Sequence, residues 1–223
     1  MGQKGGELMK EQNDYSKFLS LEHEKQERIL NAAMKEFLIG FKKASTDNIV
    51  RDAGISKGLL FHYFGTKEKL YNFLIDYAVD TIRHEYIDLV NVMLPDLLDS
   101  IWQTSLLKQD LSLRYPAIFD FLTAAYLNEK KQGTLNEKLK SVVHMQQETI
   151  EKIYAYADKS LFRGDICAHE AMKLITLTLH GFAHARLTEA DNENPGSFAR
   201  ENYEKYLEEL QGILTIFRKT FYK

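Results

Sequence analysis

Apolar residues recur at the spacing of an α-helix along almost the whole chain of 223 residues, and no segment alternates between apolar and polar residues as a strand would. Only 3 prolines and 12 glycines interrupt this pattern, and both residue types disfavour helix interiors. In the first long segment, Ile29, Leu30, Ala33 and Phe37 share one helix face. The sequence therefore predicts an all-α protein of about nine helices, three short ones followed by six longer ones.

Capping residues and helix breakers predict where these helices begin and end. Ser45, Ser56 and Thr66 are placed to cap helices with their hydroxyls, and Gly54 and Pro95 are placed to end them. The expected helices cover about residues 22–39, 45–53, 56–64, 67–94, 96–108, 116–131, 134–161, 165–189 and 198–222.

The composition narrows the class of protein. The net charge of −3 excludes a chain that coats nucleic acid by bulk charge. Cys167 is the single cysteine, so no intramolecular disulfide can form, which fits a reducing cytosol. Residues 1–20 lack the apolar stretch of a signal peptide and are expected to be a mobile leader. No apolar run approaches the roughly 20 residues of a membrane helix, and we expect a cytoplasmic protein without a membrane partner.

The segment 46–64 has the pattern of a helix-turn-helix. Two short helices are joined by Ala53-Gly54-Ile55-Ser56, in which the glycine allows a tight turn. Five apolar side chains can be buried between the helices: Ile49, Val50, Ile55, Leu60 and Phe64. Such a pair places its second helix in the major groove of DNA.

The second helix of this pair has the composition of a recognition helix. Its N-terminus directs backbone N–H groups outward, which suits phosphate. Lys57 adds positive charge, Gly58 allows close approach, and His62 and Tyr63 offer hydrogen bonds at a surface. Between residues 41 and 70 there are six cations and three anions, although the whole chain is acidic. Generic helix pairs with a glycine turn rarely bind DNA, but Lys57, His62 and Lys67 have no core role that would explain them.

This segment resembles the N-terminal signature of the tetracycline-repressor (TetR) family of bacterial transcriptional regulators. The resemblance covers roughly residues 22–82 and is carried by Arg28-Ile29-Leu30-Asn31-Ala32-Ala33, Phe37, Gly40-Phe41, Ile49, Ala53-Gly54-Ile55-Ser56-Lys57-Gly58, Leu60, Tyr63-Phe64 and Lys67-Glu68-Lys69-Leu70. It implies a sequence-specific DNA-binding regulator rather than an enzyme, with no cofactor. It also implies a helix-turn-helix domain over residues 21–66 and a larger helical domain over 67–223 that binds a small-molecule effector and forms a homodimer.

The resemblance assigns the expected contacts with double-stranded operator DNA by position. The family usually has a small or polar residue at the position of Leu59 and a tyrosine at that of Phe61, whereas both are apolar here. The resemblance thus implies no polar base contact at Leu59 and no phosphate-binding hydroxyl at Phe61, and contact with thymine methyl groups is the physical alternative. The full set of expected DNA contacts is Thr46, Lys57, Gly58, Leu59, Phe61, His62, Tyr63 and Lys67.

The last two expected helices are candidates for the dimer interface, because one short recognition helix reads too few bases alone. The first carries a stripe with small residues: Leu174, Leu177, Thr178, Gly181 and Ala185. The second carries a more apolar stripe: Tyr203, Tyr206, Leu207, Leu210, Ile213, Leu214 and Phe217. Both stripes could instead be core within one chain.

Aromatic and polar residues on otherwise apolar helices are candidates for an effector pocket. They are Trp102, Tyr115, Phe119, Tyr126, His144, Tyr154, His180 and Arg186. His180 and His184 have the i, i+4 spacing of a metal-chelating pair, but no third ligand is evident, and no metal site is predicted.

The sequence favours a repressor released from a palindromic operator by an effector, and two other functions stay open. One is a helical enzyme with a vestigial helix-turn-helix, although no nucleophile elbow, phosphate loop or acidic metal pair is present. The other is an architectural DNA-binding factor without an effector, which would have a collapsed C-terminal core.

Overall fold

The structure is a computed structural model that describes residues 15–193 and 203–223, without the side chains of residues 187–193. The described residues form ten α-helices and no β-strand, which confirms the predicted all-α class. The helices are α1 (Ser16–Leu19), α2 (His23–Phe37), α3 (Thr46–Ala53), α4 (Lys57–Phe64), α5 (Lys67–Glu85), α6 (Leu97–Arg114), α7 (Pro116–Gln132), α8 (Glu137–Tyr156), α9 (Ala168–Glu193) and α10 (Tyr203–Phe221).

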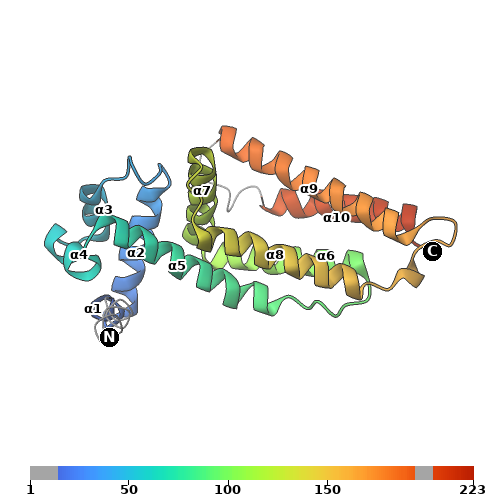
Figure 1. Ribbon diagram of the computed structural model, residues 1–223, viewed down its shortest axis with the longest axis horizontal. Coiled ribbons are helices and arrows are strands. Elements are labelled where there is room, and N and C mark those ends of the chain that lie inside the picture. Colours follow the sequence, from blue (N-terminus) through green and yellow to red (C-terminus); the bar gives the residue numbers. More distant parts are fainter. Residues whose placement is uncertain (1–14, 194–202) are drawn as a thin grey trace, which may run out of the picture.

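The helices form a small N-terminal group and a larger bundle (Figure 1). Helices α1 to α4 gather at one end, and α5 runs from this group along the bundle. Helix α7 stands across the end of the bundle that faces α2, while α6, α8, α9 and α10 run lengthwise. Helix α7 packs on α2 and α6, so it bridges the two parts.

Local sequence signals explain the helix-turn-helix. The Ser45 hydroxyl accepts a hydrogen bond from the Asp47 N–H at 3.2 Å, and the Ser56 hydroxyl accepts one from the Leu59 N–H at 3.2 Å. Gly54 has φ +66°, a left-handed conformation that side chains disfavour, and it ends α3. The predicted boundaries of α3 and α4 are therefore confirmed, with Ser45 and Ser56 as caps.

The long helix predicted over residues 67–94 is wrong in its last third. Helix α5 begins at Lys67 as predicted but ends at Glu85, and a short 3-10 helix, η2 (Ile87–Leu89), follows. Tyr86 leaves the helical conformation and is buried, as is Val90. Packing of these two side chains in the bundle outweighs a helical pattern that would otherwise continue to Pro95.

Other predicted boundaries shift for similar reasons. The helix predicted over residues 134–161 ends at Tyr156, and η3 (Lys159–Leu161) follows it. Ala157 turns away from helical geometry, and the Asp158 N–H donates to the carbonyl of Pro95 at 2.8 Å. Helix α6 extends past residue 108 to Arg114, which pairs with Glu85 and Asp110. The predicted start of the last helix at residue 198 lies outside the described residues.

The end of the predicted leader is folded rather than mobile. Helix α1 buries Phe18, whose ring centroid lies 4.8 Å from that of Phe64 in α4. Tyr15 packs on Phe73 of α5 with ring centroids 4.6 Å apart. Tyr15 and Phe18 both pack on Phe64, on the buried face of α4. The polar residues around them are the reason that the sequence predicts a leader over this segment. Residues 1–14 of the leader lie outside the described residues.

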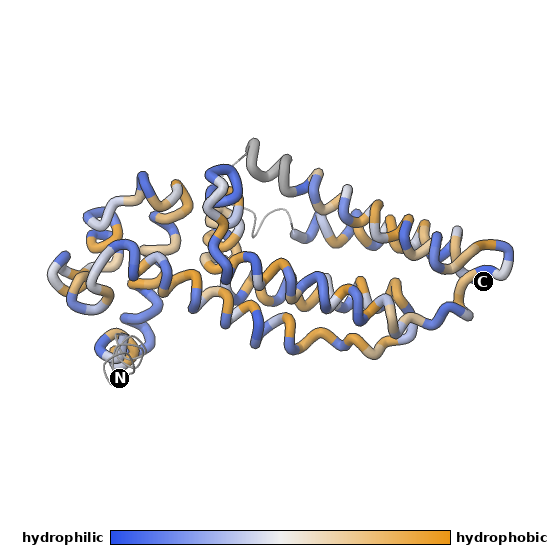
Figure 2. The backbone as a smooth tube through the Cα atoms, viewed as in Figure 1, coloured by the Kyte–Doolittle hydropathy of each residue, from blue (hydrophilic) through white to orange (hydrophobic). Residues whose placement is uncertain are grey.

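Hydrophobic positions recur along both parts of the molecule and are interrupted by polar ones throughout (Figure 2). Within the described residues, no helix is both long and apolar enough to cross a membrane.

Candidate nucleic-acid interface and cavities

Helix α4 presents one face to solvent. Lys57, Gly58, Leu59, Phe61 and His62 are exposed, whereas Leu60 and Phe64 are buried between the helices, together with Ile49 of α3. Val50 and Ile55 are half-buried. Leu59 and Phe61 are 38% and 37% exposed, so two large apolar side chains are available for contact on this face.

Gly58 has no structural reason to be glycine. A Cβ at this position would meet nothing nearer than the Ser56 hydroxyl oxygen, at 3.9 Å. Glycine lowers the stability of a helix relative to alanine. The absence of a side chain therefore leaves space outside the protein, next to the N-terminus of α4.

Tyr63 differs from the prediction. It was expected to offer a hydrogen bond at the surface, but it is only 7% exposed and packs on Phe18. Its neighbour His62 keeps the exposed position. A helix turns by about 100° per residue, so these adjacent side chains lie on different faces.

The two lysines at helix starts have protein partners. Lys57 Nζ lies 2.8 Å from a carboxylate oxygen of Asp47, so α3 and α4 are joined by an exposed ion pair. Lys67 Nζ lies over the ring of Phe41, 4.8 Å from its centroid. Thr46 is half-buried at the start of α3. Lys57 is exposed and Lys67 is half-buried, at the starts of α4 and α5.

An aromatic cluster joins this interface to the bundle. We call Phe37, Phe41, Tyr71 and Phe121 the junction cluster. The Phe37 and Tyr71 ring centroids are 5.0 Å apart, and Tyr71 lies 5.7 Å from Phe121 of α7. The Tyr71 hydroxyl donates a hydrogen bond to Glu129 at 2.9 Å. The pKa of Tyr71 is raised, mainly by burial and also by this hydrogen bond. The cluster thus connects α2, α5 and α7, and Lys67 touches it through Phe41.

Two cavities lie among the bundle helices. One has a volume of about 210 Å³ and is lined from α6, α8, α9 and α10, with Tyr86 and Ile87. The other has a volume of about 300 Å³ and is lined from α5, α6, α7 and α8. Lys108 and Gln146 line both, so the two cavities adjoin there.

Half of the predicted pocket residues line these cavities. Tyr154 and His180 line the smaller cavity, and Phe119 and Tyr126 line the larger one. The other four line neither. His144 is exposed beside Glu148, Tyr115 adjoins Arg114 at the start of α7, Trp102 is half-buried, and Arg186 pairs with Glu209 of α10.

Lys108 and Gln146, which line both cavities, are among the cavity residues that sequence reasoning missed. A lysine and a glutamine on helices are ordinarily assigned to the surface, and only the packing of α6 against α7 and α8 turns these two inward. The sequence carries no local signal of it.

The two helices predicted to form the dimer interface differ in exposure. On α10, Leu210, Leu214 and Phe217 are buried within the chain, and Leu210 is only 1% exposed. On α9, Leu174 and Leu177 are 53% and 58% exposed, and Gly181 is also exposed. Helix α10 adds Ile216, 62% exposed. The more apolar stripe of α10 faces the core of its own chain, because burying these side chains there removes them from water.

Within the described residues, no group of three or more histidine, cysteine, aspartate or glutamate side chains is placed to hold a metal ion.

These features define a class of protein: a capped helix pair with an exposed second helix, set on a larger helical bundle that contains cavities. Residues 29–73 match the model of the family described as bacterial regulatory proteins, tetR family. This match covers α3 and α4 and most of α2. Over these residues the chain is similar to the TetR family, and the whole chain shares the fold of solved TetR family regulators.

Solved structures share the fold over most of their length. A TetR family transcriptional regulator from Chloroflexus aurantiacus J-10-FL has a TM-score of 0.59 at 17% identity, over 93% of this chain and 98% of that one. The MbdR regulator from Azoarcus sp. CIB has a TM-score of 0.56 at 19% identity, over 83% and 96%. PfmR from Thermus thermophilus, a TetR family transcriptional regulator, has a TM-score of 0.56 at 16% identity, over 84% and 97%. A search of curated protein sequences found no match.

Proposed function

We propose that this protein is a homodimeric repressor that binds a palindromic operator through α4 and is released by a small-molecule effector. The exposed face of α4 carries the proposal: Gly58, Leu59, Phe61 and His62 face solvent beside a capped helix N-terminus. In this role Thr46, Lys57, Tyr63 and Lys67 contact the phosphate backbone, and the exposed residues of α4 enter the major groove. For Tyr63, only the part of the side chain that remains exposed is available.

The exposed apolar face of α9 supports dimerisation. Leu174, Leu177 and Gly181 are exposed on α9, and Ile216 is exposed on α10. Large apolar side chains gathered on an exposed face are typical of subunit interfaces. The small residues Gly181 and Ala185 allow two helices to approach closely. We propose that this face pairs with the same face of a second copy, around a two-fold axis.

Helix α7 supports a route from effector to operator. Its residues Phe119 and Tyr126 line the larger cavity, while Phe121 belongs to the junction cluster that Lys67 touches. A ligand that binds two positions of α7 unequally shifts the balance between them. In the proposed mechanism, this shift moves the N-terminal group and changes the separation of the two recognition helices.

The cavities also bear on the two alternatives. An architectural factor needs no ligand site and would have a collapsed core. Two adjoining cavities of about 210 and 300 Å³ lie among the bundle helices of this chain, which favours a ligand-binding protein. An enzyme would turn over the molecule that it binds, so recovery of the effector unchanged after incubation is the expected result. Because the family is bacterial, we place the action of the protein in the cytoplasm, with the DNA.

The test begins with purified full-length protein and fragmented DNA of the source genome. Fragments retained by the protein are sequenced, and the best one is used in gel shifts with a small-molecule extract of the same cells. We expect retained fragments to share an inverted repeat, and a component of the extract to release the protein. Retention without a common motif would contradict operator binding, and a complex that every extract fraction leaves intact would contradict release.

A further inference from the structure

Lys108 lies where the two cavities of the bundle meet. It belongs to α6, and its side chain lines both the smaller and the larger cavity. Its Nζ lies over the ring of Phe119 of α7, 5.7 Å from the ring centroid. Lys108 is half-buried, and it borders both cavities.

Within the part of the chain that the structure describes, no neighbouring carboxylate balances the positive charge of Lys108. Neither cavity is lined by an aspartate or a glutamate, and among the described residues no carboxylate forms an ion pair with Lys108. Burial lowers the pKa of the Lys108 ammonium, because desolvation disfavours its charged form. A buried ammonium without a partner is costly, and the cost is removed when an anion binds beside it.

The surroundings of Lys108 are divided in polarity. The smaller cavity carries the hydroxyls of Thr104 and Ser105 next to Lys108, and Gln146 adds an amide. The larger cavity is walled mainly by apolar side chains of α5, α7 and α8: Ile82, Phe119, Leu122, Leu127, Leu139 and Val142. Together the two volumes reach the range of small-molecule pockets, about 300–1,000 Å³.

We propose that the effector is an amphipathic carboxylate whose carboxylate group binds Lys108 and whose apolar chain occupies the larger cavity. This inference rests on the proposed function, because it names the ligand class of the same site. The ammonium donates to the carboxylate oxygens in a charge-assisted hydrogen bond. A cationic ligand would be repelled at the same position, and a neutral chain would leave the ammonium unpaired.

Isothermal titration calorimetry of the full-length protein with decanoate and decan-1-ol tests this class directly. The two probes have the same chain length and differ in the charge of the head group. We expect decanoate to bind at least about tenfold more tightly, the factor that corresponds to about 1.4 kcal/mol. Equal affinities, tighter binding of the alcohol, or no binding of either probe would overturn the proposal.

Two variants assign the preference to Lys108. In Lys108→Met the unbranched chain is kept and the charge is removed, so decanoate should lose its advantage while decan-1-ol binds as before. Lys108→Arg keeps the charge and should keep most of the preference. Thermal unfolding checks that both variants are folded, and we expect Lys108→Met to be at least as stable as the parent protein. A Lys108→Met variant that still prefers decanoate would assign the preference to another group and refute the proposal.

Gel shifts on the same samples separate this inference from the proposed function. If a cationic or neutral compound releases the DNA and decanoate has no effect, the proposed repressor function stands and the proposed carboxylate effector is wrong. If decanoate binds tightly but leaves the DNA complex intact, the proposed ligand class stands and the proposed release of DNA by the effector is contradicted.

Discussion

At the residue scale, the exposed face of α4 contains a glycine that packing within the protein does not require. Gly58→Ala should stabilise the isolated protein by up to about 1 kcal/mol, since alanine favours helix. It should weaken operator binding by about tenfold or more, because a methyl group would hold the N-terminus of α4 away from the phosphate that it approaches. Urea unfolding and gel shifts on one preparation measure both effects. If the variant binds DNA as well as the parent protein, α4 does not approach the backbone at this residue.

The two lysines beside α4 differ in how much of their charge is available to DNA. Lys67 touches only the ring of Phe41 among its described contacts, whereas Lys57 pairs with Asp47 at 2.8 Å. Lys67→Ala should therefore flatten the slope of log affinity against log salt by about one unit on every DNA sequence. Lys57→Ala should flatten it by less, because Asp47 already offsets part of that charge. Salt titrations measure the slopes, with Lys152→Ala on the remote helix α8 as control. An unchanged slope for Lys67→Ala would exclude its phosphate contact.

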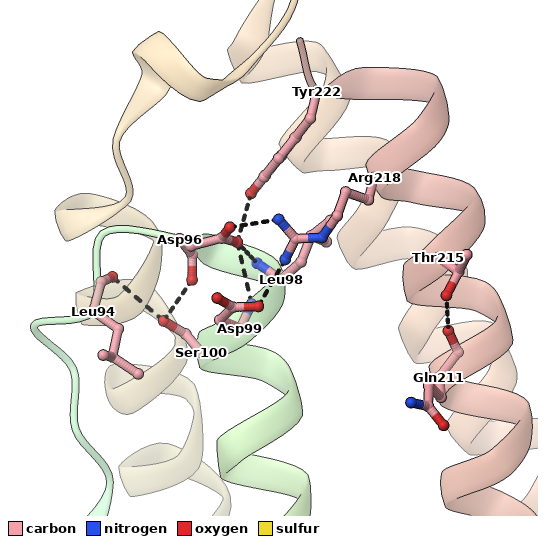
Figure 3. Close-up of polar contacts among 9 residues, drawn as sticks. All are labelled: Leu94, Asp96, Leu98, Asp99, Ser100, Gln211, Thr215, Arg218 and Tyr222. Atoms are coloured by element: carbon pink, nitrogen blue, oxygen red, sulfur yellow. Dashed lines mark hydrogen bonds and ion pairs between the residues drawn. The ribbon is translucent and has the colours of Figure 1, made fainter.

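At the element scale, α10 is fixed to the start of α6 by one polar cluster (Figure 3). Arg218 donates to Asp96 at 2.7 Å and to Asp99 at 2.7 Å, and the Tyr222 hydroxyl donates to Asp96 at 3.1 Å. Asp96 also caps α6 by accepting from the Leu98 and Asp99 N–H groups. Burial alone would raise the pKa of Asp96, but the hydrogen bonds and charge of Arg218 outweigh it, and the pKa is lowered.

This cluster predicts a pH-dependent contribution to stability. Because the folded state lowers the pKa of Asp96, its stabilising effect is complete above the unfolded pKa of about 3.9 and is lost as the pH falls through the folded value. Asp96→Asn keeps a capping side chain and removes the charge. It should lower the free energy of unfolding by about 1 kcal/mol at pH 7, a modest value because Arg218 is partly exposed. Urea unfolding should show this difference shrinking below about pH 4. A difference that stays constant down to pH 3 would exclude the ion pair as its source.

Elements whose ends depend on neighbouring residues could be predicted from the sequence. Ser45, Gly54, Ser56 and Thr66 act on the helix next to them, and all four act as predicted. The end of α5 could not be predicted in this way, because Tyr86 leaves the helix to pack against other elements. The same limit applies to the cavities. Lys108 and Gln146 face inward only because α6 and α8 are packed together.

At the scale of the whole molecule, the exposed face of α9 predicts where two copies meet. Leu177→Glu or Gly181→Glu should give monomers that lose operator binding while the helix-turn-helix stays folded, since a buried unpaired charge opposes association. Leu210→Glu is unsuitable for this test, because Leu210 is in the core of one chain. Leu113→Glu, an equal change at an exposed leucine of α6, is the matched control and should remain dimeric. Sedimentation and gel shifts on the same samples decide the outcome. Dimers of Leu177→Glu with full DNA binding would place the interface elsewhere.

Selection of bound DNA from a random pool by the full-length protein tests the central claim most directly, namely that two copies of α4 read one operator. The account predicts an inverted repeat whose half-sites are centred about one helical turn apart, roughly 34–36 Å. It also predicts that His62→Ala alters the selected bases, and that Leu59→Ala relaxes a preference for thymine at one position, without a change in half-site spacing. A pool without an inverted repeat, or both variants selecting the parental motif with undiminished preference, would contradict it.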